Sequence, residues 1–299
     1  MTTSSRVKPS LIHDDIKATL VSMTLPMLVG MITLMTFSLV DTFFISMLGT
    51  EQLAAISFTF PISFALISLV IGLSIGTSAV IAKALGAGRL TEARTDGQVA
   101  LWLSGILVAL LAIPGYLFTD TLFGLLGAND TILLYIRQYM DVWFAGAVLL
   151  ALPMVGNSVL RAAGDTKTPS IIMAGSGLVN AVLDPVLIFG FGPIPALGMQ
   201  GAAIATLISW VFGSVLIIYL LVKRDLISTS WIHVTQLNQV CRKILRIGLP
   251  AAGANMLTPL AMAVLTAILA NYGASAVAAF GVGARIESIA CLVVLALSM

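Results

Sequence analysis

Residues 53–82 read LAAISFTFPISFALISLVIGLSIGTSAVIA, a stretch that contains no Asp, Glu, Lys or Arg. A bilayer core about 30 Å thick is crossed by about 20 apolar residues in a helix that rises about 1.5 Å per residue. This stretch is therefore long enough to cross a membrane as one helix, with length to spare for tilting or kinking.

The composition of the whole chain agrees with this reading. Of its 299 residues 59% are hydrophobic and 9% are charged, and the mean hydropathy is +1.07. Soluble domains carry about 25% charged residues, so this chain has too few charges to cover a surface that faces water. The composition excludes a cytosolic enzyme, a nucleic-acid-binding protein and a disordered chain, and the net charge of +2 gives no reason to expect a polyanion as partner.

Working outward from residues 53–82, the apolar runs predict eight membrane spans. None shows the strict alternation of a barrel strand, so we expect an all-α polytopic membrane protein. The spans are predicted at residues 18–46, 53–82, 97–119, 131–160, 170–190, 200–222, 246–271 and 275–299.

Basic residues predict the orientation. The N-terminal tail and every second connection hold 13 of the 15 Lys and Arg residues, whereas the other connections carry Glu51, Asp120 and Asp130. The positive-inside rule therefore places the N-terminus in the cytoplasm. The first apolar run is longer than the apolar region of a signal peptide, so we expect it to remain as a membrane helix.

A weak internal repeat divides the chain. Leu25-Pro26 aligns with Leu249-Pro250, and at the same offset Gly49 aligns with Gly273. We interpret residues 1–222 as a six-helix lobe, 223–245 as a cytoplasmic connection and 246–299 as the first two helices of a second, incomplete lobe. Within the connection we expect an amphipathic stretch around Trp231. Six spans return the chain to its starting side, so the repeat is expected to be parallel.

Two carboxylates are predicted inside the membrane at similar depth. Asp41 lies in the outer half of the first span and Asp184 in the outer half of the fifth, with Asn180 on the same helical face as Asp184. Tyr139, in the fourth span, lies at comparable depth. Acids within spans are functional candidates, since burying their charge costs at least a few kcal/mol. We interpret the four residues as an ion-coupling pocket that exchanges H⁺ or Na⁺ for a substrate; a structural hydrogen-bond cluster is the alternative.

Other polar and small residues in the spans have structural interpretations. Arg137 lies four residues before Asp141, a spacing that predicts a neutralising ion pair. Gly72 and Gly76 form a small-xxx-small pattern that favours close helix packing. Arg285 and Glu287 are two residues apart and do not face each other, so we expect their partners in the missing part of the second lobe.

Four motifs give the chain a family resemblance. They are Val40-Asp41-Thr42, Gly86-Ala87-Gly88-Arg89, RAAGDTKTP at residues 161–169, and GMQGAAIAT at residues 198–206. With these motifs the chain resembles the multidrug and toxic compound extrusion (MATE) transporters. The resemblance implies twelve helices in two six-helix lobes, which alternate in access and exchange Na⁺ or H⁺ for amphipathic, often cationic, compounds.

Within that family the chain resembles the DinF-type branch, and the pocket residues of that branch correspond here to Asp41, Tyr139, Asn180 and Asp184. The resemblance implies that Asn157 lines the cavity and that helix 1 bends at Pro26. It also implies that a threonine common in this pocket is replaced by Ala202. Met173 suits an adaptable apolar cavity wall.

These expectations converge on a secondary active multidrug antiporter in a bacterial inner membrane. We expect a monomer that is not an enzyme, uses no cofactor or metal besides the coupling ion, and contacts small amphipathic compounds and the bilayer. A lipid-linked precursor flippase of the same superfamily is one alternative, although it favours a cavity lined by cations. An intramembrane hydrolase is another, although no nucleophile motif is present.

Overall fold

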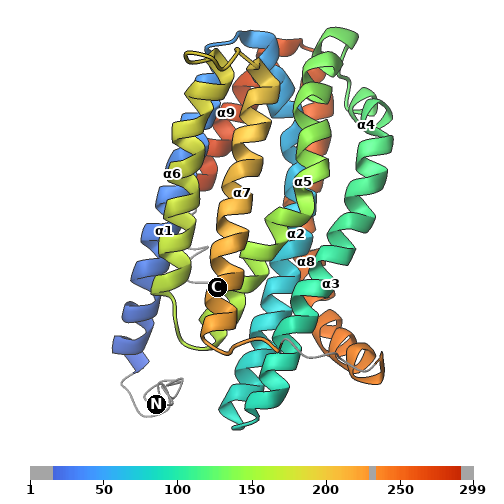
Figure 1. Cartoon of the computed structure of the whole chain (residues 1–299). Helices are drawn as coiled ribbons and strands as arrows, with labels where there is room; N and C mark the ends of the chain where they lie inside the picture. The colour runs from blue at the N-terminus through green and yellow to red at the C-terminus, as the bar shows by residue number, and fades with distance from the viewer. Residues whose placement is uncertain (1–15, 229–233, 291–299) are drawn as a thin grey trace.

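The computed structural model describes residues 16–228 and 234–290, and nearly all of these residues are helical. The helices stand side by side in one bundle (Figure 1). They are α1 Ile16–Ser46, α2 Thr50–Gly86, α3 Leu90–Leu117, α4 Thr119–Leu125, α5 Asp130–Ala162, α6 Lys167–Phe189, α7 Gly198–Lys223, α8 Val234–Ala270 and α9 Ala274–Ala290.

The predicted spans correspond to all of these helices except α4. Seven are long and apolar enough to cross a membrane; α9 is shorter within the described residues, and the rest of its predicted span, 291–299, lies outside them. The short helix α4 was not predicted. It is anchored by Phe123, which is fully buried.

Helix α8 begins inside the segment predicted as the inter-lobe connection, well before residue 246. Its first turns are amphipathic: Val240 and Ile244 are buried, whereas Lys243 is on the outside. The low hydropathy of these turns hid a helix that packs through one face only. The amphipathic stretch predicted around Trp231 lies outside the described residues.

The two turns aligned by the repeat have related backbone conformations. Gly49, between α1 and α2, has a φ of 141°, and Gly273, between α8 and α9, has a φ of 97°. Residues with side chains rarely adopt either value. Both turns lie at the upper end of the molecule in Figure 1, whereas the basic turn between α2 and α3 and the turn between α5 and α6 lie at the lower end.

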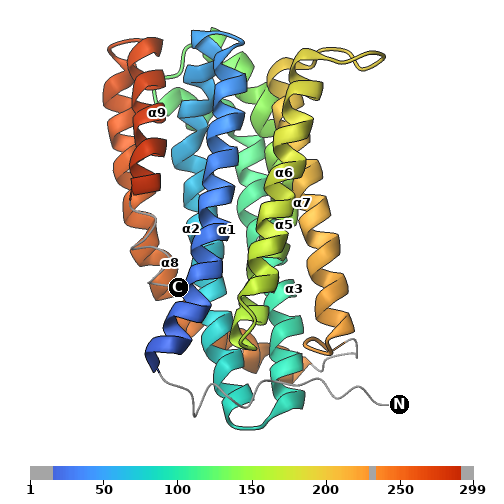
Figure 2. The same ribbon diagram turned by 90° about the vertical axis from the view of Figure 1, so that its left-hand side faces the viewer.

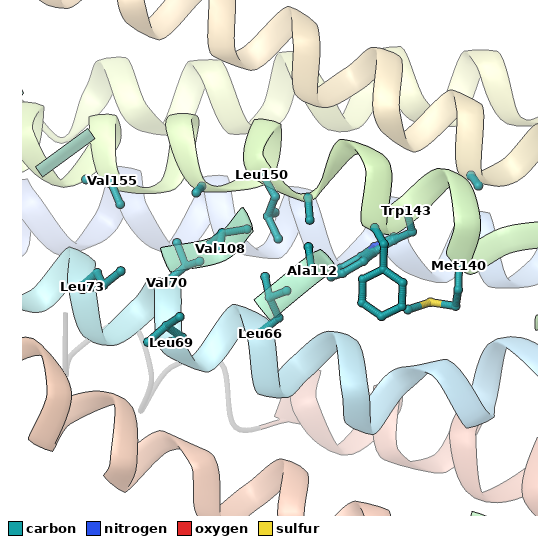
Figure 3. Close-up of a cluster of buried hydrophobic side chains, with 14 of the residues drawn as sticks. Leu66, Leu69, Val70, Leu73, Val108, Ala112, Met140, Trp143, Leu150 and Val155 are labelled. Carbon is teal, nitrogen blue, oxygen red and sulfur yellow. The ribbon is translucent and has the colours of Figure 1, made fainter. Parts of the chain in front are cut away.

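Helix α2 is central to the packing. It contacts α3 and α5 on one side and α8 and α9 on the other, and Figure 2 shows α8 and α9 grouped together beside it. Leu66 and Val70 of α2 meet Val108 of α3 and Trp143 of α5 in the buried cluster of Figure 3. Large apolar side chains on the outer faces, such as Leu117 and Val215, are exposed and suit contact with lipid.

Helices α2 and α8 cross with almost no space between their backbones. A Cβ added to Gly72 would lie 2.5 Å from the Gly248 carbonyl oxygen, and one added to Gly76 would lie 2.6 Å from the Ile244 carbonyl oxygen. The prediction that Gly72 and Gly76 serve close packing is therefore confirmed, and the helix they meet is α8.

Candidate functional site

The two membrane carboxylates are brought together by α1 and α6, which pack side by side (Figure 2). Asp184 is fully buried and Asp41 is 8% exposed. They lie close enough to interact electrostatically, and Tyr139 of α5 is buried within range of both. Three helices thus contribute the polar groups that the sequence placed at a common depth.

Asn180 holds Asp184 and links it to α7. Its Nδ2 donates to Asp184 Oδ1 at 3.2 Å, across one turn of α6, and lies 3.5 Å from Thr206 Oγ1. Tyr139 of α5 lies within interaction range of the same Thr206. Thr206 therefore belongs to the site.

The sequence interpretation missed Thr206, because it looked for a hydroxyl at Ala202. Residues four apart lie on one face of a helix, so Thr206 occupies the Ala202 face one turn further along α7. That spacing, within the quoted motif at residues 198–206, was the signal that could have found it. Ala202 itself is fully buried.

The two aspartates keep unused hydrogen-bonding capacity. Asp41 Oδ1 and Asp184 Oδ2 are buried oxygens without a hydrogen-bond partner in the described part of the chain. An unpaired buried acceptor is costly, commonly by about 1–3 kcal/mol, so these oxygens favour binding a proton or cation. In the ranges 16–228 and 234–290, no group of three His, Cys, Asp or Glu side chains could hold a metal ion.

Three other residues named from the sequence lie apart from this pocket. At a rise of about 1.5 Å per residue, Asn157 is about 27 Å from Tyr139 along α5, although it is buried and its Oδ1 has no partner. Met173, which is half-buried, is about 16 Å from Asp184 along α6, and Pro26 is about 22 Å from Asp41 along α1. Helix α1 runs unbroken through Pro26, so its role as a hinge stays a prediction.

A cation from α9 joins the pocket. The Arg285 guanidinium donates to the Ser38 carbonyl oxygen at 3.1 Å and lies over the Phe60 ring at 5.8 Å. Its charge also acts on Asp41. The sequence analysis expected the partner of Arg285 in the missing part of the second lobe, whereas the structure gives it a partner on α1. Residues 247 positions apart are related only by the fold, so spacing could not predict this contact.

The predicted ion pair between Arg137 and Asp141 is wrong. Arg137 instead binds Asp120 through two hydrogen bonds, of 2.5 Å from Nε and 2.7 Å from Nη2. Asp120 lies in α4, the helix that was not predicted, so its proximity could not be read from spacing. The hydrogen bonds from Arg137 hold the pKa of Asp120 below its ordinary value.

The motif at residues 161–169 forms a hydrogen-bonded turn that joins α5 and α6 to the end of α7. Asp165 accepts hydrogen bonds from the Thr168 backbone N–H at 3.0 Å, from the Thr168 hydroxyl and from Arg224 at the end of α7. Burial alone would raise the pKa of Asp165, but these hydrogen bonds outweigh it and lower the pKa. This acid has partners on several sides, unlike Asp41 and Asp184.

Comparison with known proteins gives consistent matches. The MatE family model matches residues 26–186. The chain is 47% identical to an FAD transporter of Shewanella oneidensis over 96% of its own length and 64% of that protein. It is 30% identical to the multidrug export protein MepA of Staphylococcus saprophyticus over 92% of its own length and 60% of that protein.

A solved structure gives the same picture. The MATE transporter VcmN of Vibrio cholerae, in its bent form, matches with a TM-score of 0.80 and 39% identity over 94% of this chain and 63% of that one. The chain therefore spans slightly less than two thirds of the length of the proteins it matches.

Proposed function

Because this chain belongs to the MatE family of membrane transporters, we propose that it forms part of a secondary active exporter of amphipathic compounds, driven by the entry of H⁺. The transporter would be a monomer that spans a bacterial inner membrane several times, with its N-terminus in the cytoplasm. Na⁺ remains the alternative coupling ion, since carboxylate, amide and hydroxyl oxygens also suit a hard cation.

The observation that supports this proposal best is the pair of buried carboxylates, each with an oxygen that lacks a partner. Two carboxylates near each other in a poorly solvated pocket resist ionising together. The pocket therefore favours one positive charge, which either a proton or a cationic substrate can supply. This competition is what an antiporter needs.

The transport cycle follows from that competition. In the outward-facing state, protonation of the Asp41 and Asp184 pair removes negative charge and weakens the binding of a cationic substrate. Deprotonation toward the cytoplasm restores the site. The membrane potential adds about 2.3 kcal/mol per elementary charge for each 100 mV.

The test is ethidium transport in proteoliposomes, with H⁺ and Na⁺ gradients imposed separately. We expect an H⁺ gradient to drive transport and Asp41→Asn to reduce the driven rate at least about tenfold and remove its pH dependence. Glu51→Gln, in the exposed first turn of α2, is the matched control and should transport normally. An Asp41→Asn protein with the wild-type rate and pH dependence would contradict the proposal.

Export of FAD is a second candidate function. It is favoured by the 47% identity to an FAD transporter and by a cation beside an aromatic pair: Arg285 lies over Phe60, which stacks on Phe64 at 5.1 Å. For the two substrates, the binding affinity should change in opposite directions with pH. Cationic ethidium should bind more tightly as the aspartates lose protons, whereas anionic FAD should bind more tightly as they gain them. Binding isotherms for both compounds at several pH values separate these possibilities.

A further inference from the structure

Arg285 is a cation in α9, the described part of the eighth predicted span, and is held mainly by neutral groups. It donates to the Ser38 carbonyl oxygen at 3.1 Å and lies over the Phe60 ring at 5.8 Å. A carbonyl dipole and a ring face attract a cation but do not neutralise it. A charge at this depth is expensive without a counter-ion, so the acids near Arg285 decide its stability.

Asp41 has the geometry of that counter-ion. It lies three residues after Ser38, on the same face of α1, and its Oδ1 is buried without a partner. The two charges act on each other although they are not joined in a direct ion pair. Asp41 comes from the first lobe and Arg285 from α9 of the second.

The other groups around Asp41 do not replace Arg285. Helix α6 contributes Asp184, a like charge, while α5 and α7 contribute the neutral hydroxyls of Tyr139 and Thr206. The charged residues of α2, Glu51 and Lys83, lie toward its two ends. Those of α8 (Arg242, Lys243 and Arg246) lie in its cytoplasmic half, and Glu287 of α9 is exposed.

Packing alone holds α9 to α1 only weakly. Helix α9 packs chiefly against α2 and touches α1 lightly, and Figure 2 shows it on the α8 side of the bundle. The hydrogen bond from Arg285 to Ser38 thus joins two helices that share little apolar contact. Such a contact responds strongly to local charge.

We propose that Arg285 is a positioning residue that ties α9 to α1 while Asp41 is charged, and that neutralising Asp41 releases α9. This inference rests on the proposed exchange at Asp41 and adds the structural change that follows from it, the movement of α9 relative to α1. When a proton or cation occupies the pocket, Asp41 no longer balances the charge of Arg285, and the contact between α9 and α1 weakens. When the pocket is empty, the attraction between the two charges holds α9 against α1.

The test is a pulsed electron spin resonance distance measurement in nanodiscs. Spin labels replace Phe43 on α1 and Tyr272 before α9, which are 62% and 77% exposed, in a background without Cys241 and Cys291. We expect mainly short distances at neutral pH and a ratio of long to short distances about tenfold higher in acid, within the usual range of coupling between sites. Asp41→Asn should give the acid distribution at both pH values.

Substitutions at Arg285 distinguish the contribution of its charge from that of its hydrogen bond. Arg285→Gln keeps a hydrogen-bond donor but removes the charge, so it should give the acid distribution at both pH values; Arg285→Lys should restore the pH response. The double variant Arg285→Gln with Asp41→Asn should equal either single variant. Glu287→Gln, on the exposed side of α9, should behave as wild type, and thermal unfolding checks that each variant is folded.

A folded Arg285→Gln protein that keeps the wild-type pH response would overturn this inference. These distances require no transport, so the outcomes are distinguishable. If the distances between the two labels change with pH as expected but no H⁺-driven efflux occurs, the proposed function is wrong and the contact between Arg285 and α1 is supported. If H⁺-driven efflux occurs and the distances are the same in the Asp41 and Arg285 variants as in the wild type, only the proposed role of Arg285 is wrong.

Discussion

The acidic pocket and the crossing of α2 with α8 differ in how completely their groups are packed and paired. At the crossing, glycines bring two backbones together: an extra Cβ at Gly72 or Gly76 would lie 2.5–2.6 Å from atoms of α8. In the pocket, Asp41 and Asp184 are buried, yet each leaves an oxygen without a partner. One region has no spare space, and the other has spare hydrogen-bonding capacity.

The difference indicates which region keeps the fold fixed and which region can change its charge state. Two backbones in such close contact have few alternative packings, so the crossing suits a fixed contact. A pocket whose acids keep oxygens without partners can gain or lose a positive charge, so it suits a switch. Substitutions in the pocket should therefore alter transport more than stability, and substitutions at the crossing should do the reverse.

The largest effect on H⁺-driven efflux is expected for Asp184→Asn. Removing one of two neighbouring buried charges relieves repulsion, so the thermal midpoint should stay level or rise, as often happens when a functional group is replaced. H⁺-driven efflux should fall about tenfold or more. Efflux in proteoliposomes and unfolding in detergent measure the two quantities on one preparation. An active but unstable variant would remove the contrast between the regions.

Gly76→Ala should give the opposite result at the crossing. The added methyl meets the Ile244 carbonyl, which is backbone and cannot rotate away, so α8 must shift. Overpacking of this kind costs about 1–3 kcal/mol. Gly86→Ala is the matched control on the same helix, since a Cβ there meets nothing within 4 Å. If thermal unfolding shows equal stability for both variants, the crossing is looser than its geometry indicates.

The sequence was sufficient for features that depend on local spacing. Apolar runs located the spans, small-residue spacing identified the face of Gly72 and Gly76, and helical periodicity placed Asn180 beside Asp184. It failed where a partner comes from a distant helix. Arg137 meets Asp120 from an unpredicted helix, and Arg285 meets α1, because neither contact leaves a periodic signal.

Thr206→Val tests whether the pocket extends to α7. Valine keeps the shape but removes the hydroxyl that Asn180 contacts at 3.5 Å, a change worth about 0.5–1.5 kcal/mol for one hydrogen bond. We expect efflux to fall about threefold, with a smaller effect for Thr206→Ser. Ethidium efflux at saturating gradient checks this, and a wild-type rate in the valine variant would restrict the working pocket to α1, α5 and α6.

The smallest effect is expected for Asp120→Asn, an acid whose partner is already in place. The pair with Arg137 is about half exposed, so solvent screens it and its contribution to stability should stay below about 1 kcal/mol. Because the folded state lowers the pKa of Asp120, this contribution is present above the ordinary value of 3.8 and is lost as pH falls toward the folded value. The unfolding midpoints of the wild type and of the Asp120→Asn variant should therefore converge below about pH 4. Efflux should be unchanged, because a carboxylate that is satisfied at every working pH has no second charge state to offer, whereas Asp41 and Asp184 do.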